Sequence, residues 1–170
     1  LPAITVGPIT KAVGYDGSGC DAARTTAATR LEVGGVEYLF YAGVPFGNNQ
    51  DLGLATSTDG GQSWTKATDV PLIARTQAPD WASVRIVPIR AVYEDEVFKL
   101  WYSGNSANLF TDSSNAHGFG YATSPDGLSW TVQEEAIRVE VGASAGAHLL
   151  EVVKWNGSYL AYYDDLTAGQ

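Results

Sequence analysis

The sequence predicts an all-β protein built from repeated four-stranded antiparallel sheets, and three observations carry this prediction. Its 170 residues include 45% hydrophobic but only 17% charged residues, which is enough apolar content for a folded core. The 19 glycines, 9 tyrosines and 5 tryptophans favour turn-rich β structure, and no segment shows helical periodicity. An aromatic strand pattern also recurs at a nearly constant interval along the chain.

Three aromatic segments repeat one another, at residues 38–43, 99–104 and 159–164. They align on Leu39, Leu100 and Leu160, and the second interval is shorter than the first by a single position. The first two segments are each followed by a Gly-x-Ala-Thr-Ser strand and a Ser-x-Asp-Gly turn that ends in Trp. The chain therefore reads as two full copies and part of a third.

Each copy predicts four short strands in order. An apolar run forms the first strand, a tight turn leads into the aromatic strand, a variable loop follows, and the Asp-Gly turn joins the last two strands. In the second copy these strands are expected at 85–93, 97–103, 118–123 and 129–133, with a possible extension at 137–141.

A repeated four-stranded antiparallel meander is typical of the blades of a β-propeller. We expect blades at about 21–73 and 74–141 and half a blade at 142–170, with an outer strand at 1–13, all in one domain. A propeller ring closes with at least about four blades. The chain should therefore form an incomplete ring that self-associates through its open blade edges or lacks a second piece.

The composition also excludes several function classes. The formal charge of −9 leaves no basic surface for a nucleic-acid backbone or an anionic membrane. No apolar run approaches the roughly 18 residues that span a bilayer. Cys20 is the only cysteine, so no intrachain disulfide or cysteine-based metal site is expected. Because the sequence has no methionine and starts at Leu1, we expect either a processed, secreted protein, extracellular or periplasmic, or a piece cut from a longer chain.

Two turn motifs carry a resemblance to known families. Residues 57–64, Ser-Thr-Asp-Gly-Gly-Gln-Ser-Trp, resemble the Asp-box of sialidases, and residues 124–130 resemble its shorter form. The Leu-Trp-Tyr-Ser-Gly strand at 100–104, followed by the strand and turn at 120–130, resembles the five-bladed β-propeller glycosidase superfamily of arabinanases, β-xylosidases and invertases. The resemblance covers 21–164 and implies a carbohydrate-active module, with glycan binding or glycoside hydrolysis at a central pocket.

The motif residues themselves are expected to be structural. A turn aspartate accepts backbone N–H bonds, and the tryptophan that follows packs inward. The residues concerned are Ser57, Asp59, Gly61, Trp64, Ser124, Asp126, Gly127 and Trp130. No cofactor or metal is demanded by these residues, and calcium at the axis is implied by the resemblance alone.

The resemblance implies catalytic carboxylates at the starts of the innermost strands, typically as an Asp before a Pro. Val87 precedes Pro88 at the corresponding place. The remaining catalytic candidates are Asp21, which precedes the first inner strand, and Glu151, which falls within the third. For Asp21 the competing interpretation is a turn residue in a Gly-rich segment.

Basic residues recur at the same inner-strand position. Arg24 and Arg85 are separated by the same interval as the two leucines of the first two copies, and the third copy brings His148 to about the same place. Guanidinium groups pair bidentately with carboxylate or phosphate, so their convergence predicts a site for a uronic acid, sialic acid or phosphorylated sugar. The alternative is that the arginines bridge neighbouring blades by pairing with Asp21, Asp16 or Asp80.

The other ligand-binding candidates at this rim are Asp16 and Asp80, and Trp81 as a platform for a sugar ring. His117 lies in a polar segment and is expected to be a solvated loop residue. Three functions remain open: a carbohydrate-active module, a non-catalytic subunit that is completed by neighbouring chains, and a fragment of a longer propeller glycosidase.

Overall fold

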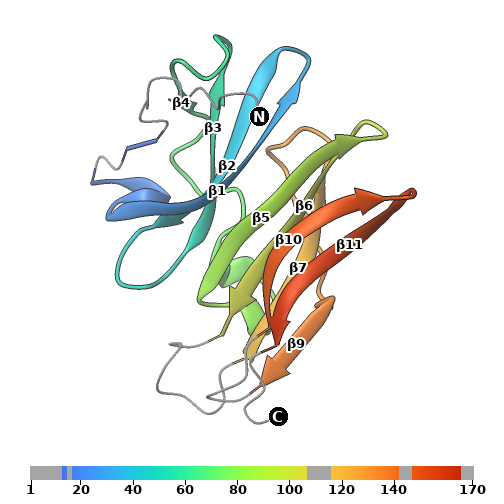
Figure 1. The fold of residues 1–170 in the computed structure, drawn as a ribbon. Helices are drawn as coiled ribbons and strands as arrows, with labels where there is room; N and C mark the ends of the chain where they lie inside the picture. The colour runs from blue at the N-terminus through green and yellow to red at the C-terminus, as the bar shows by residue number, and fades with distance from the viewer. Residues whose placement is uncertain (1–12, 15–16, 107–115, 142–146, 166–170) are drawn as a thin grey trace, which may run out of the picture.

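The computed structural model describes residues 13–14, 17–106, 116–141 and 147–165, which form three antiparallel sheets (Figure 1). Their helical content is limited to the 3-10 turns η1 (Gly19–Asp21), η2 (Arg75–Gln77) and η3 (Asp80–Ala82). Within this described part, no helix has the length and apolar character needed to cross a membrane. The predicted all-β class is therefore confirmed.

The first sheet is a four-stranded meander in the order β1-β2-β3-β4. Its strands are β1 (Arg24–Val33), β2 (Val36–Val44), β3 (Asp51–Ser57) and β4 (Thr65–Lys66). The turn between β1 and β2 is made by Gly34 and Gly35, both at positive φ, a conformation that glycine adopts without steric cost.

The second sheet repeats this order with β5 (Arg85–Glu94), β6 (Val97–Asn105), β7 (Ala116–Ser124) and β8 (Thr131–Val132). A further strand, β9 (Arg138–Val141), pairs with the other end of β7. The strands expected in the second copy, including the extension at 137–141, are thus confirmed to within two residues at each end.

The third sheet is a hairpin of only two strands, β10 (Ala147–Trp155) and β11 (Ser158–Asp165). In Figure 1 it lies beside the second sheet, on the side away from the first. The described residues therefore make two blades and half of a third, and they do not close a ring. The outer strand expected at 1–13 falls almost entirely outside the described residues.

The three sheets share one register, which repeats at a constant interval along the chain. A β-bulge interrupts the first strand of each sheet, between Thr25 and Ala28 in β1, Pro88 and Arg90 in β5, and Leu149 and Glu151 in β10, and the pairs beyond it are equivalent in the three sheets. The equivalent pairs are Thr29 with Phe40, Arg90 with Trp101, and Glu151 with Tyr162.

This register corrects the sequence alignment of the third copy by one residue. The true equivalent of Leu39 and Leu100 is Ala161 and not Leu160, because the hairpin turn sits at Asn156 and Gly157. The sequence pattern alone could not decide this, since either of two adjacent tyrosines, Tyr162 and Tyr163, fits the repeat.

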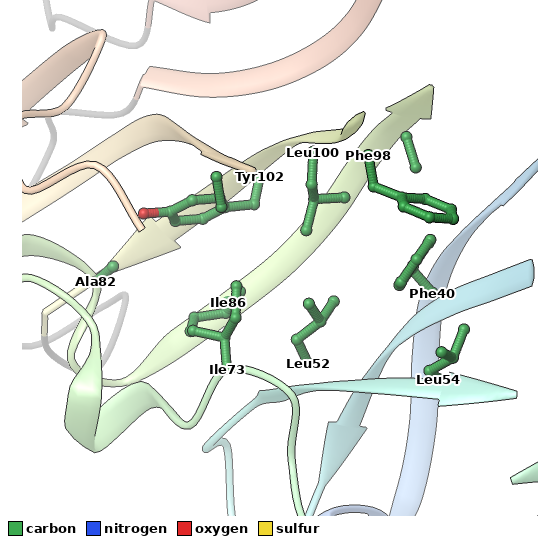
Figure 2. Packing of buried hydrophobic residues seen from close by; sticks show 11 residues of the cluster. Phe40, Leu52, Leu54, Ile73, Ala82, Ile86, Phe98, Leu100 and Tyr102 are labelled. Carbon is green, nitrogen blue, oxygen red and sulfur yellow. The ribbon is translucent and has the colours of Figure 1, made fainter. Parts of the chain in front are cut away.

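The main core lies between the first two sheets (Figure 2). Phe40 approaches the Trp130 ring edge-to-face at 5.4 Å between centroids, and Phe98 packs against Tyr38 at 5.1 Å. The fully buried aliphatic side chains in this core are Leu52, Leu54, Ile86 and Leu100. Burial of this apolar surface holds blades one and two together.

A second, smaller core joins the second sheet to the half-blade. Trp101 and Phe119 pack there against Leu149 and Val152, and the Trp101 ring lies 4.4 Å from the Tyr159 ring. Backbone N–H groups also donate across neighbouring sheets, from Ala91 to the Thr29 hydroxyl at 3.2 Å and from Leu149 to the Ser103 hydroxyl at 2.9 Å. Each sheet is thus fixed to the next by apolar packing and by a hydrogen bond.

Candidate functional site

Arg24 and Arg85 are the first residues of the innermost strands of blades one and two. Gln50 of the first blade binds the start of β5, because its backbone carbonyl accepts from Ile86 N–H and its N–H donates to the Val84 carbonyl, both at 3.0 Å. These bonds form a short parallel bridge between Gln50 and Arg85. The fold therefore brings the start of β5 against the loop of the first blade.

Polar groups lie at the start of both inner strands. Arg85 Nε donates to the Asn48 carbonyl at 3.0 Å, and the Gln50 side-chain amide donates to the Thr26 hydroxyl at 2.9 Å. Burial and the nearby charge of Arg24 both lower the pKa of Arg85. We call Arg24, Thr26, Gln50 and Arg85, with the Asn48 carbonyl, the two-arginine site.

Within the described part of the chain, no carboxylate forms an ion pair with Arg24 or Arg85. Asp21, one of the proposed partners, is 1% exposed; it pairs with Lys66 Nζ at 2.9 Å and accepts from the Tyr41 hydroxyl at 3.3 Å. Two adjacent cations without a carboxylate partner favour the binding of an anion.

Asp80 begins η3 and is exposed, and Asp16 lies outside the described residues. Neither provides a described carboxylate for the arginines.

The two catalytic candidates lie in different surroundings. Asp21 is buried beside Lys66, whereas Glu151 is exposed at the bulge of β10 and accepts from its neighbour Val152 N–H at 3.0 Å. In the shared register Glu151 is equivalent to Arg90, five residues beyond Arg85, which is about 15 Å along a strand. Carboxylates that flank one glycosidic bond are about 5–9 Å apart. The structure therefore places Glu151 away from the two-arginine site.

His148 lies in β10 opposite Asp164, and its side chain is outside the described part of the structure. The corrected register changes its predicted position. The residue equivalent to Arg24 and Arg85 is number 146, so His148 comes two residues later in its strand.

Trp81 lies against blade two next to the start of β5. Its ring stacks on Tyr102 at 5.6 Å with an 8° angle between the planes. A Cβ built on Gly104 would meet both the Arg85 carbonyl at 2.9 Å and the Trp81 ring at 3.0 Å. Trp81 is therefore a half-buried wall beside the two-arginine site, with one ring face already covered.

The two Ser-x-Asp-Gly turns are held by their own side chains. The Asp59 carboxylate accepts from Gln62 and Ser63 N–H, each at 2.9 Å. Ser57 Oγ accepts from Gly61 N–H, and the Trp64 indole donates to the Gly61 carbonyl, each at 3.0 Å.

The second turn has the same bonds. Asp126 accepts from Leu128 and Ser129 N–H, at 2.8 and 2.7 Å. Ser124 accepts from Gly127 N–H at 2.8 Å, and Trp130 donates to the Gly127 carbonyl at 3.1 Å. These bonds lower the pKa of Asp126 to about 2 and that of Asp59 further, with bonds from Ser63 as the main cause for Asp59.

Some site residues were missed or misjudged from sequence. His117 is a buried strand residue in β7 and not a solvated loop residue, because β7 begins at Ala116 and pairs on both sides. Thr26 and Gln50 were not singled out, although the polar run before β3 was a usable signal.

The described residues hold no group of three or more His, Cys, Asp or Glu side chains that could bind a metal ion. The two-arginine site carries positive charge, which repels a cation. Calcium, implied only by the resemblance, does not fit the residues at these strand ends.

Solved structures share this fold. The BT0996 RGII complex superposes with a TM-score of 0.71 at 14% identity, over 89% of this chain and 51% of that protein. Sucrose-6-phosphate hydrolase from Lactobacillus gasseri gives a TM-score of 0.61 at 17% identity, over 85% and 30%. Zg3597, a family 117 glycoside hydrolase from Zobellia galactanivorans, gives 0.54 at 17%, over 72% and 41%.

At these identities the likeness shows the fold, and the chain spans about half or less of each of these proteins. No family model matches the sequence. No curated protein matches it either.

Proposed function

We propose that this chain is a carbohydrate-binding propeller module that holds an anionic sugar at the two-arginine site. The observation that carries the proposal is the adjacency of Arg24 and Arg85 without a carboxylate partner among the described residues. Guanidinium groups bind carboxylate and phosphate through paired N–H donors. The ligand is accordingly a uronic acid, a sialic acid or a phosphorylated sugar.

Two further observations support a sugar over a simple anion. The chain shares its fold with structures of glycoside hydrolases, and one of these is named for sucrose-6-phosphate, itself an anionic sugar. The site also combines charged groups with the Gln50 amide and Thr26 hydroxyl, beside the aromatic ring of Trp81. Hydroxyl-rich ligands use such neutral partners for orientation.

We propose binding and not hydrolysis as the activity of these residues. Glycoside hydrolysis uses two carboxylates on either side of one bond. Asp21 is engaged by Lys66 and Tyr41, and Glu151 lies in another blade at a different strand level. A hydrolytic function would need a second acid from outside the described residues.

The test is a calorimetric titration with glucuronate, galacturonate and glucose 6-phosphate, with neutral glucose as the ligand control. An R24Q/R85Q double variant should bind the anionic sugars at least tenfold more weakly, because each charge-assisted hydrogen bond contributes about 1.5–3 kcal/mol. Arg90→Gln is the matched control, since Arg90 is an exposed arginine of the same strand, β5. Equal binding by wild type and double variant, or equal affinity for glucose, would refute the proposal.

A further inference from the structure

The positions that pack one blade against the next recur in all three sheets. Phe40 and Leu31 of the first sheet pack into the core shared with the second sheet. Their equivalents one repeat later, Trp101 and Val92, pack into the core shared with the half-blade. The same positions have therefore been used twice for contact with a neighbouring antiparallel sheet.

The third set of equivalents has no such neighbour among the described residues. Tyr162 and Val153 are the counterparts of Trp101 and Val92 in the next repeat, and Leu150 is the counterpart of Ile89. Together with two neighbouring residues they form an exposed apolar surface, which we call the outer face. Its members and exposed fractions are Leu150 62%, Val153 36%, Trp155 65%, Leu160 41% and Tyr162 56%.

Lys154 is directed away from this face, whereas the exposed Glu151 carboxylate, opposite Tyr162, lies at it. Lys154 Nζ contacts Glu94 of blade two at 2.8 Å, and the Tyr159 hydroxyl donates to the same carboxylate at 2.5 Å. Soluble proteins rarely leave so many large apolar side chains together in water, and such a surface marks an interaction site.

The edge next to the outer face is open as well. Within the described residues β11 pairs only with β10. Beyond it lies an open groove of about 1060 Å³, lined by residues that include Trp101, Tyr121, Gln133 and Tyr159. The half-blade thus presents both an apolar face and room at its free edge.

We propose that the outer face packs against the outer face of a second copy of this chain. In both earlier repeats these positions are covered by an antiparallel sheet of the same kind, and a second copy brings such a sheet. A twofold contact needs only one self-complementary surface.

A head-to-tail contact with blade one is disfavoured. Phe98 and Tyr102 of blade two face the preceding sheet. Their equivalents in blade one, Glu37 and Tyr41, are already buried, so they offer no exposed surface to a second copy. The exposed apolar surface that a second copy offers is therefore its own outer face.

The test is the solution mass by light scattering across a concentration series. Wild type should reach twice 18.0 kDa, and an L150K/Y162K variant should stay at 18.0 kDa. The matched control is F46K/V70K, which places two lysines on side chains of blade one that are 61% and 67% exposed. This control should remain a dimer.

Near-UV circular dichroism checks that every variant keeps its aromatic packing. A monomeric wild type, or a dimer that survives L150K/Y162K with intact packing, overturns the proposal. A series of masses above the dimer also overturns it, because a closed twofold contact stops at two copies.

Discussion

At the scale of single residues, the two turn aspartates show how one carboxylate can replace several backbone bonds. Asp126 and Asp59 each accept two consecutive N–H groups that no strand partner reaches. The serine two positions earlier accepts a third group in each turn. The turn is therefore satisfied locally, which lets β7 and β8 pair over only two residues each.

We predict that Asp126→Asn lowers Tm by a few degrees at pH 7, because the amide accepts less strongly than the ionised carboxylate. The folded pKa of about 2 lies below the ordinary 3.8. This contribution to stability is therefore present above pH 3.8 and disappears as the pH falls through 2. The Tm difference between wild type and variant should accordingly shrink in acid.

Scanning calorimetry at pH 7 and pH 2.5 measures both Tm values. Asp69→Asn, at an exposed aspartate near the first turn, is the control and should leave Tm unchanged. A difference that persists undiminished in acid would show that ionisation of Asp126 is not its source.

At the scale of elements, the three hairpins that start the aromatic strands differ in one respect. Two are closed by Gly34–Gly35 and Asn156–Gly157, whereas Asp95 and Glu96 take positive φ values of 54° and 61° without a glycine. Left-handed backbone costs about 1–2 kcal/mol for a residue with a Cβ. At Glu96 the second blade therefore contains backbone strain that Gly35 and Gly157 avoid at the equivalent position of the other two hairpins.

Glu96→Gly should raise the free energy of unfolding by about 0.5–1 kcal/mol, since the gain in the fold is partly offset by the freer unfolded chain. Urea unfolding measures the change. Glu96→Ala is the matched control, because it removes the exposed carboxylate but keeps the Cβ. If the alanine variant gained as much as the glycine variant, charge and not backbone strain would be the cause.

Local patterns made most of the fold predictable from sequence. The strands of the second copy were expected to within two residues because their turns and alternating apolar residues are local signals. The equivalent places of Arg24 and Arg85, at the starts of β1 and β5, also followed from their spacing. Features that depend on pairing across the sheet could not be predicted from local patterns. The pairing of β9 with β7 buries His117. The position of the hairpin turn at Asn156 shifts the alignment of the third copy by one residue.

At the scale of the whole molecule, ionisable groups define a pH range of full stability. Hydrogen bonds, mainly from Lys154 and Tyr159, lower the pKa of Glu94 to about 2, and the turn aspartates are lowered as well. Burial raises the pKa of Cys20 to about 11, and burial also raises the pKa of Tyr102. Each of these shifts favours, in the folded protein, the state that the group has at neutral pH: an ionised carboxylate, or a neutral thiol or phenol.

The urea midpoint should be level between about pH 5 and pH 8.5 and fall on both sides. Lowered carboxyl pKa values give stability that is lost as pH falls below the ordinary 3.8–4.5 towards 2. Raised thiol and phenol pKa values give stability that is lost as pH rises above the ordinary 9.0–10.0, where the unfolded chain ionises first.

The control for the alkaline side is Cys20→Ser. In this variant the fall of the urea midpoint should begin at a higher pH, close to the ordinary pKa of tyrosine. A midpoint that stays constant from pH 3 to pH 10 would contradict the assignment of these groups.

The register common to the three sheets also bears on descent. The hairpin turn and the pairs of the aromatic strand recur in phase, and a bulge precedes them in each sheet, so one unit contains the elements of one inner hairpin. Tandem duplication of a gene segment that encodes one unit would place each new hairpin turn in register with its aromatic strand. A lineage built from such units can therefore gain or lose blades in whole steps.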